Sequence, residues 1–153
     1  MTGWIVIHMY NIIVLHHFYG YPVLMDDTAN DIRYAQLLCL MDRVNNYDTI
    51  ILCNTQDEDE RMLAIKNIAR SESYTWIDYI DEELEHLLNK HNIILTPSNT
   101  NVIIGGTNTS GCILYNSEFS VKSWTDLGFN VQVCLSMCAD YQSDGINGAE
   151  KNQ

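Results

Sequence analysis

The chain has 153 residues, which is enough for one domain with a sizeable core. Hydrophobic residues make up 46% and aromatic residues 10%, which is the composition of a globular protein and excludes a disordered one. Acidic residues outnumber basic residues by 20 to 8, giving a net charge of -12, so the surface repels phosphate backbones and nucleic-acid binding is not expected.

The first predicted element is a buried strand at Trp4–Ile7. A second apolar run, Ile12–Leu15, either continues this strand or forms another short element. From His16 to Asp27 we expect a loop, because Gly20 and Pro22 interrupt any regular pattern.

A helix is predicted to begin at the capping residue Thr28 and to end near Asn45. Its inward face is predicted to contain Ile32, Ala35, Leu38 and Met41. Thr49–Cys53 then reads as a second buried strand, and its continuous apolar run suits a parallel sheet covered on both faces.

The remaining predicted elements continue this alternation. They are a helix at Glu60–Ala69, a strand at Tyr74–Tyr79, a helix at Glu82–His91 with Leu84, Leu87 and Leu88 facing inward, a strand at Val102–Ile104, a helix within Ile113–Leu127 that ends at Gly128, and a strand at Asn130–Leu135. We expect a single α/β domain over residues 1–140 with a mainly parallel sheet, and a polar tail over 141–153.

The five cysteines favour a reducing compartment. Cys39, Cys53 and Cys134 lie in apolar runs and are expected to be buried and reduced, which indicates a cytoplasmic protein. The apolar start of the chain, Trp4–Leu15, has no basic region before it and is too short to span a bilayer, so we expect neither a secretory signal nor a membrane protein.

A glycine-rich turn is predicted at Gly105–Cys112, between a strand and a helix. A cysteine at a helix N-terminus loses its proton more easily, and the thiolate is a nucleophile, so Cys112 is a candidate catalytic residue. The spacing of Gly106 and Gly111 matches a phosphate-binding loop, but the lysine that such a loop needs is replaced by Cys112. Nucleotide binding is therefore a minor alternative, and no cofactor is predicted.

This turn and the later Gly128–Val133 run resemble the isochorismatase-like cysteine hydrolase family, which includes nicotinamidases. The N-terminal run Val6–Asn11 and the Thr55–Asp57 run resemble two further segments of that family. The resemblance implies a three-layer α/β/α, Rossmann-like fold of the isochorismatase type. It also implies that Cys112 attacks a carbonyl or imine carbon.

The family uses an aspartate and a lysine beside its cysteine, and both differ here. His8 stands at the aspartate position and is the candidate base. The lysine position falls near Ser73, so Lys66 or Arg70 is a candidate only with a shifted alignment. A histidine at a strand end is also often a hydrogen-bonded core residue, and that alternative stays open for His8.

Four further residues are candidates for the substrate site. Backbone N–H groups around Asn108, Thr109 and Gly111 are expected to stabilise an oxyanion, and Tyr10 is expected to line the substrate pocket. Trp76 and Tyr79 are candidates for the same pocket, and ordinary core packing explains all three aromatic residues at least as well. No metal site is predicted. The run from Asp57 to Asp59 is expected to be a solvated acidic loop, although a hard-cation site is conceivable there.

Two functions follow from these observations. In the first, the protein hydrolyses a small amide or related C–N substrate, with Cys112 as nucleophile and His8 as base. In the second, it is a catalytically degraded family member that serves as a binding or structural subunit. We do not expect the residues after Asp140 to form the family's last helix and strand, so a sheet edge is expected to be open to a partner, which favours a homo-oligomer or a protein complex.

Overall fold

Five strands and four helices alternate along the part of the chain that the structure describes. The computed structural model describes residues 9–16, 27–44, 48–54, 60–79, 82–107, 114 and 119–139. In chain order the elements are β1 (Tyr10–His16), α1 (Asp27–Arg43), β2 (Asp48–Cys53), α2 (Glu60–Ser71), β3 (Thr75–Asp78), α3 (Leu84–Lys90), β4 (Thr100–Thr107), α4 (Val121–Asp126) and β5 (Val131–Ala139).

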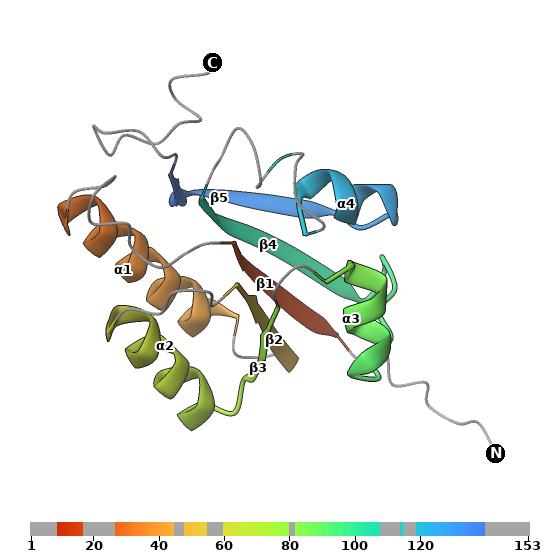
Figure 1. Ribbon diagram of the computed structural model, residues 1–153, viewed down its shortest axis with the longest axis horizontal. Helices are drawn as coiled ribbons and strands as arrows, with labels where there is room; N and C mark the ends of the chain where they lie inside the picture. Colours follow the sequence, from red (N-terminus) through yellow and green to blue (C-terminus); the bar gives the residue numbers. More distant parts are fainter. Residues whose placement is uncertain are drawn as a thin grey trace.

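The strands form one sheet in the order β3-β2-β1-β4-β5, and every neighbouring pair is parallel (Figure 1). The chain builds the sheet outward from β1 to β3 and then returns to add β4 and β5 on the other side of β1. The direction of winding therefore reverses between β1 and β4. In open parallel sheets, ligands bind at the carboxyl ends of the strands beside such a reversal.

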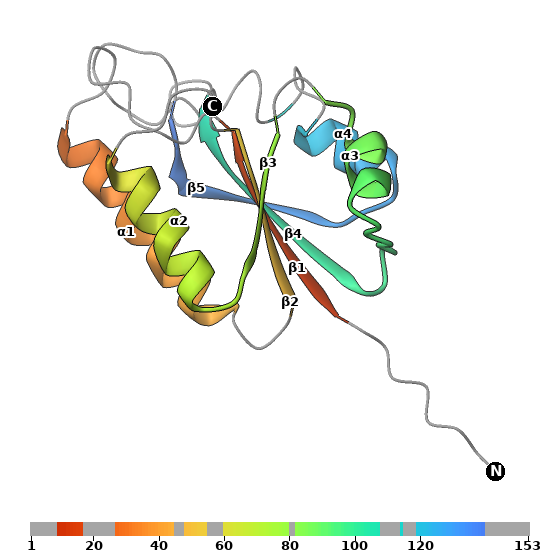
Figure 2. The ribbon, with the colours of Figure 1, turned by 60° about the horizontal axis from the view of Figure 1, so that its bottom comes forward.

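Helices cover both faces of the sheet, with α1 and α2 on one face and α3 and α4 on the other (Figure 2). The core on the α3 and α4 side contains Ile12 and Val14 of β1, whereas the core on the α1 and α2 side contains Ile13 and Leu15. Alternate residues of β1 thus point into opposite cores, as expected for a strand that is buried on both faces. The three-layer α/β/α, Rossmann-like fold is confirmed.

Four predicted elements in the middle of the chain are confirmed to within a few residues, namely β2, α2, β3 and α3. Leu84, Leu87 and Leu88 of α3 are all buried, as predicted. In α3 the apolar residues recur at helical spacing, whereas β2 is a short continuous apolar run that begins with β-branched residues, so length and composition distinguish the two.

The first strand of the sheet differs from the first predicted strand. β1 contains the second apolar run, Ile12–Leu15, and ends at His16, whereas Trp4–Ile7 lies outside the described residues. Residues 11–16 are all buried, because β1 is the central strand and is covered on both faces. His16 was expected to begin a loop and is instead the last residue of the central strand.

The helix α1 is present as predicted, but most of its predicted inward face points to solvent. Ile32, Ala35 and Leu38 are exposed, and only Met41 of that set is buried. The inward residues of α1 are Arg33, Tyr34, Leu37, Leu40 and Met41. The prediction was wrong because α1 carries apolar side chains on both sides, so that periodicity could not choose between them.

The two glycines of the predicted turn are strand residues. Gly105 and Gly106 belong to β4, which continues to Thr107. The strand β5 is likewise longer than expected and ends at Ala139. Both strands extend the sheet toward its carboxyl end, where the predicted site lies.

Of the helix predicted within Ile113–Leu127, the structure describes the later part, while residues 113 and 115–118 lie outside the described residues. The described helix, α4, begins at Val121, and Ser120 caps it by accepting a hydrogen bond from the Ser123 backbone N–H at 3.2 Å. A serine hydroxyl that binds the first free N–H groups starts a new helix at this point. α4 therefore begins nine residues after Cys112, and it does not support the expectation that Cys112 sits at its N-terminus.

Two further predictions concern membrane-spanning helices and the C-terminal end of the domain. Within the described ranges, no helix is long and apolar enough to cross a membrane. The predicted boundary at residue 140 and the tail over 141–153 lie outside the described residues.

Candidate functional site

The candidate site lies at the carboxyl ends of β1 and β4, where the winding of the sheet reverses. His16 is the last residue of β1 and pairs in register with Gly106 of β4. β4 then ends at Thr107, five residues before Cys112. This end of the sheet therefore brings a buried imidazole to the strand end from which the segment containing Cys112 departs.

Tyr79 holds the imidazole of His16. The His16 Nδ1 atom and the Tyr79 hydroxyl are 3.0 Å apart, and both side chains are buried. The Tyr79 ring stacks on Phe119, with ring centroids 3.9 Å apart. The hydrogen bond and the stacked ring together restrict the position of the imidazole, which is what a general base requires.

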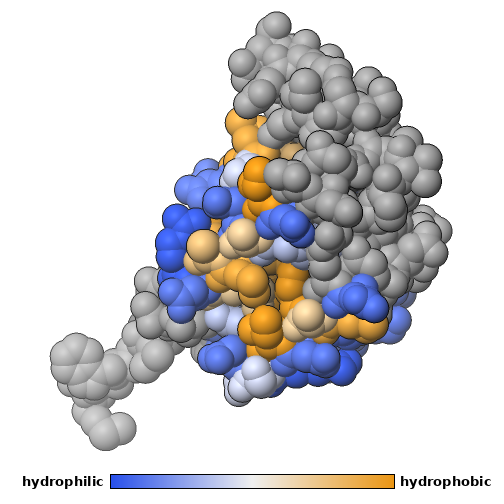
Figure 3. Space-filling view, turned by 90° about the vertical axis from the view of Figure 1, so that its left-hand side faces the viewer, coloured by the Kyte–Doolittle hydropathy of each residue, from blue (hydrophilic) through white to orange (hydrophobic). Residues whose placement is uncertain are grey.

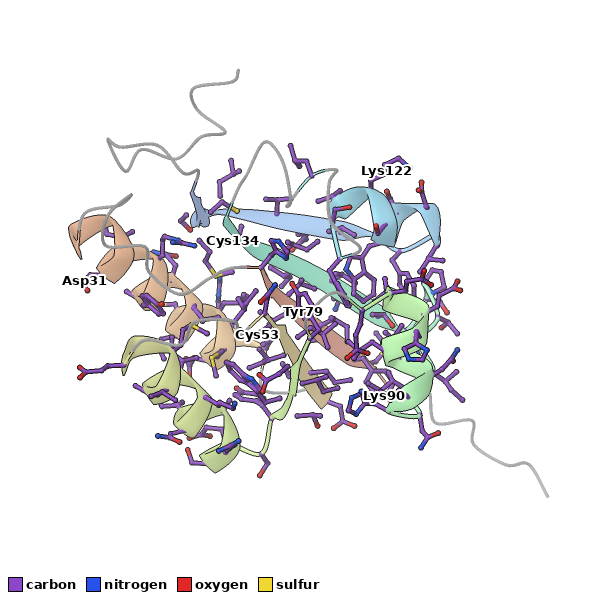
Figure 4. All side chains as sticks on the ribbon, viewed as in Figure 1. Asp31, Cys53, Tyr79, Lys90, Lys122 and Cys134 are labelled. Atoms are coloured by element: carbon purple, nitrogen blue, oxygen red, sulfur yellow. The ribbon has the colours of Figure 1, made fainter. Side chains whose placement is uncertain are left out.

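Backbone hydrogen bonds extend the sheet beyond the strand ends and fix this pair. The Asn54 N–H donates to the Leu15 carbonyl at 3.0 Å, and the Tyr79 N–H donates to the Cys53 carbonyl at 2.9 Å. Figure 4 shows Cys53 and Tyr79 close together near the ends of β2 and β3. His16 and Tyr79 are therefore anchored to adjoining parts of a rigid sheet.

The close approach of β4 to β1 requires a glycine at position 106. Gly106 has a φ of 136°, and a Cβ atom there would lie 1.9 Å from the His16 carbonyl oxygen. Any other residue would both strain the backbone and collide with β1. The glycine that drew attention to a nucleophile turn thus has a structural function next to His16.

A buried cation lies at the same end of the sheet, on the face covered by α1. Arg33 is buried, and its Nε atom donates to the Met137 carbonyl at 3.1 Å. Arg33 was not among the predicted site residues, because the inward face of α1 was predicted at other positions and the local sequence pattern does not mark Arg33 as buried.

Lys66 is on α2, and its ammonium group is engaged on the α2 side of the sheet. Lys66 forms an ion pair with Asp78 at 3.1 Å and lies 5.9 Å from the centroid of the Trp76 ring. This geometry gives Lys66 a structural partner on β3. His16 belongs to the opposite face, where it contacts Tyr79 in the core beneath α3 and α4.

Tyr10 begins β1 and therefore lies at the amino end of the sheet. It pairs in register with Asp48 and Thr100, which begin β2 and β4. Six residues of extended strand separate Tyr10 from His16, a distance of about 20 Å. The structure thus places Tyr10 far from the strand end that leads to the Cys112 segment.

The amino end of the sheet has its own buried polar cluster. The Asn11 and Thr49 side chains both donate to the Val44 carbonyl at 3.0 Å, and Asn101 donates to Asn11 at 3.3 Å. These bonds satisfy a carbonyl at the end of α1. An open groove of about 350 Å³ lies beside them, lined by Asn11, Arg43, Val44, Asn101, Val102, Ile103, Asn130 and Gln132.

Nearby, the Tyr74 hydroxyl donates to the Met41 carbonyl at 2.7 Å. Burial raises the pKa of the Tyr74 phenol, and the Glu72 and Asp42 carboxylates raise it further. Tyr74 therefore stays neutral and acts as a structural hydrogen-bond donor.

The other predicted site residues lie outside the described residues. They are His8, Asn108, Thr109, Gly111, Cys112, Asp57 and Asp59. Among the residues that are described, no group of three histidine, cysteine or acidic side chains is placed to hold a metal ion.

Comparisons with protein-family models, with curated proteins and with solved structures find no match to this chain.

Proposed function

We propose that the carboxyl end of the sheet between β1 and β4 is the active site of a cysteine-dependent hydrolase of a small amide or related C–N substrate. Cys112 is the nucleophile, and the base is His16 in place of His8. The observation that carries this proposal is the buried His16–Tyr79 pair, which ends the central strand opposite Gly106.

The length of chain after β4 allows this pairing. Cys112 follows Thr107 by five residues, which span at most about 17 Å when fully extended. Neighbouring strands of a sheet are only about 4.8 Å apart, so a segment of this length can return over the end of β1. The resemblance to isochorismatase-like hydrolases also requires a base at the end of the first strand, and in this sheet that residue is His16.

In the proposed reaction, the imidazole of His16 takes the proton of the Cys112 thiol and the thiolate attacks the substrate carbon. Backbone N–H groups near Asn108, Thr109 and Gly111 stabilise the oxyanion. The tetrahedral intermediate collapses when the C–N bond breaks, and the imidazolium returns the proton to the leaving amine. Water then hydrolyses the thioester and regenerates the thiol.

The test is the rate at which iodoacetamide alkylates each cysteine in dilute protein near neutral pH, mapped by mass spectrometry. We expect Cys112 to react faster than a free model thiol and faster than the exposed Cys39, whereas the buried Cys53 stays unmodified. His16→Ala should slow Cys112 by about tenfold or more, and His8→Ala should leave it unchanged. If Cys112 is alkylated no faster than a free model thiol, the hydrolase proposal is wrong. If only His8→Ala slows the alkylation of Cys112, the base is His8 and not His16.

A second function is supported by the position of Lys66. This lysine forms an ion pair with Asp78, which supports a function that does not use Lys66 as the cation of the family's catalytic set. A family member without its triad would serve as a binding or structural subunit, in a homo-oligomer or a complex. It would bind a small molecule at the His16 end of the sheet without hydrolysing it. This function is favoured if iodoacetamide alkylates Cys112 no faster than a free model thiol and the protein forms a stable assembly in solution.

A further inference from the structure

The outer surface of α1 and α2 carries an exposed apolar patch. Its large members are Ile32 and Leu38 of α1 and Leu63 and Ile68 of α2, each between 39% and 53% exposed. Figure 3 faces this side of the molecule and shows hydrophobic side chains gathered in the middle, with hydrophilic side chains around them. A concentrated patch of this kind marks an interaction surface in a soluble protein.

The composition of α1 also indicates an interaction surface. Its inner side packs Tyr34, Leu37 and Leu40 against the sheet, while its outer side carries Ile32, Leu38 and exposed Ala35. A helix that is apolar on both sides is typically buried between two layers. The sheet supplies one layer, and no other helix or strand of the described residues covers the outer side.

The distribution of charge favours a second copy of this chain as the partner. α1 and α2 contain five of the eight basic residues of the chain but only four of its twenty acidic residues. Arg33 is buried on the inner side, and on the outer side exposed Arg43 and Arg70 nearly balance exposed Asp31, Asp42 and Glu60. The outer surface of the pair is thus close to neutral whereas the rest of the chain is strongly acidic, so two copies repel each other less at this face.

The face is also complementary to itself. Exposed Asp31 and Glu60 lie near the amino-terminal ends of the two helices, and exposed Arg43 and Arg70 lie near their carboxyl-terminal ends. Figure 4 shows Asp31 on the outer side of α1, away from the sheet. A two-fold axis across the helices places each acidic end against a basic end of the partner. Asp42 shares the basic end and keeps the face near neutral overall.

We propose that the protein forms a two-fold homodimer through the outer surface of α1 and α2, which pack against the same two helices of a second copy. α1 is about 25 Å long, and two helices side by side offer about 500 Å² per partner, which is the lower limit for a specific interface. We therefore expect a dissociation constant in the micromolar range. This dimer is independent of the proposed chemistry, because the interface lies on the outer side of the helices.

The test is sedimentation equilibrium of the whole chain and of three variants with matched substitutions. Leu38→Glu and Leu63→Glu place a charge in the patch and should each raise the dissociation constant by about tenfold or more. Ile94→Glu is the control, because Ile94 is 80% exposed and lies outside the patch, and it should leave the dimer unchanged. Circular dichroism verifies that each variant is folded, and these substitutions are at exposed positions.

The dependence of the dimer dissociation constant on salt concentration is a second test, and it needs no variant. Added sodium chloride screens both the repulsion between two copies of net charge -12 and the exposed ion pairs between the helix ends. The ion pairs are exposed and contribute little, so the loss of repulsion dominates and the dimer should become tighter as salt increases. A monomer at high protein concentration would overturn the proposal. A dimer that is insensitive to both patch variants, or one that weakens with salt, would also overturn it, because the interface would then be elsewhere or ionic.

Discussion

The two ends of the sheet both bury polar side chains, but the partners of these side chains differ. At the amino end, Asn11 and Thr49 bind the Val44 carbonyl and so complete the hydrogen bonds of the backbone. At the carboxyl end, His16 binds Tyr79, and both groups can exchange protons. Buried polarity alone therefore does not distinguish the two ends. The chemistry of the partner does, and it is the reason that we propose the active site at the carboxyl end.

The largest effect is expected at the contact between β1 and β4. Gly106→Ala should destabilise the fold by about 3 kcal/mol or more, because the new Cβ atom would overlap the His16 carbonyl and the backbone has a positive φ. Gly128→Ala is the matched control. Gly128 also has a positive φ, but its nearest contact would be Pro97 at 3.5 Å, so the cost should be about 1 kcal/mol. Equal urea midpoints for the two variants would contradict the close approach.

The amino-end cluster provides the next effect. Asn11→Ala removes the hydrogen bonds to the Val44 carbonyl and from Asn101, and it should cost about 2 kcal/mol in urea unfolding. It should not change the alkylation rate of Cys112 in the folded protein. If Asn11→Ala slowed Cys112 as much as His16→Ala does, the distinction between a structural end and a chemical end would fail.

A smaller loss of stability is expected for Tyr79→Phe. This variant keeps the aromatic ring that stacks on Phe119 and removes only the hydroxyl that contacts His16, so it should cost about 1 kcal/mol. The alkylation rate of Cys112 should fall several-fold, because the imidazole loses the group that orients it. A variant with lower stability and unchanged reactivity would show that Tyr79 has only a structural function.

The smallest effect concerns pH. The folded state raises the pKa of Tyr74, so the neutral phenol stabilises the fold below its ordinary pKa of about 10 and this contribution is lost as the pH rises through the raised value. Urea midpoints above about pH 10 should therefore fall less steeply for Tyr74→Phe than for the parent. If the urea midpoints of both proteins fall equally steeply with pH, other titrating groups cause the decline in stability.

The fold could largely be predicted from the sequence, but two features could not, for physical reasons. Trp4–Ile7 and Ile12–Leu15 are equally apolar, so their composition does not reveal which run becomes the central strand. In α1, apolar residues on both sides hid the inward face, and the residues misread as core form the proposed dimer surface.

The candidate site was harder to predict, because it depends on register. His16 was read as the first loop residue after an apolar run, and only the pairing of β1 with β4 places it opposite Gly106. Tyr79 reaches His16 across 63 residues of sequence, a contact that no local pattern encodes. The end of the sheet proposed for the site follows from the general rule for parallel sheets, and this assignment stays a prediction.

The most direct test of the difference between the two ends is an NMR measurement on isotopically labelled protein before and after alkylation of Cys112. We predict that the ring resonances of His16 shift, because the modified thiol lies beside the imidazole. The side-chain amide resonances of Asn11, at the other end of β1, should stay in place. Unchanged His16 resonances, or equal shifts at His16 and Asn11, would contradict a chemical site at the carboxyl end of the sheet.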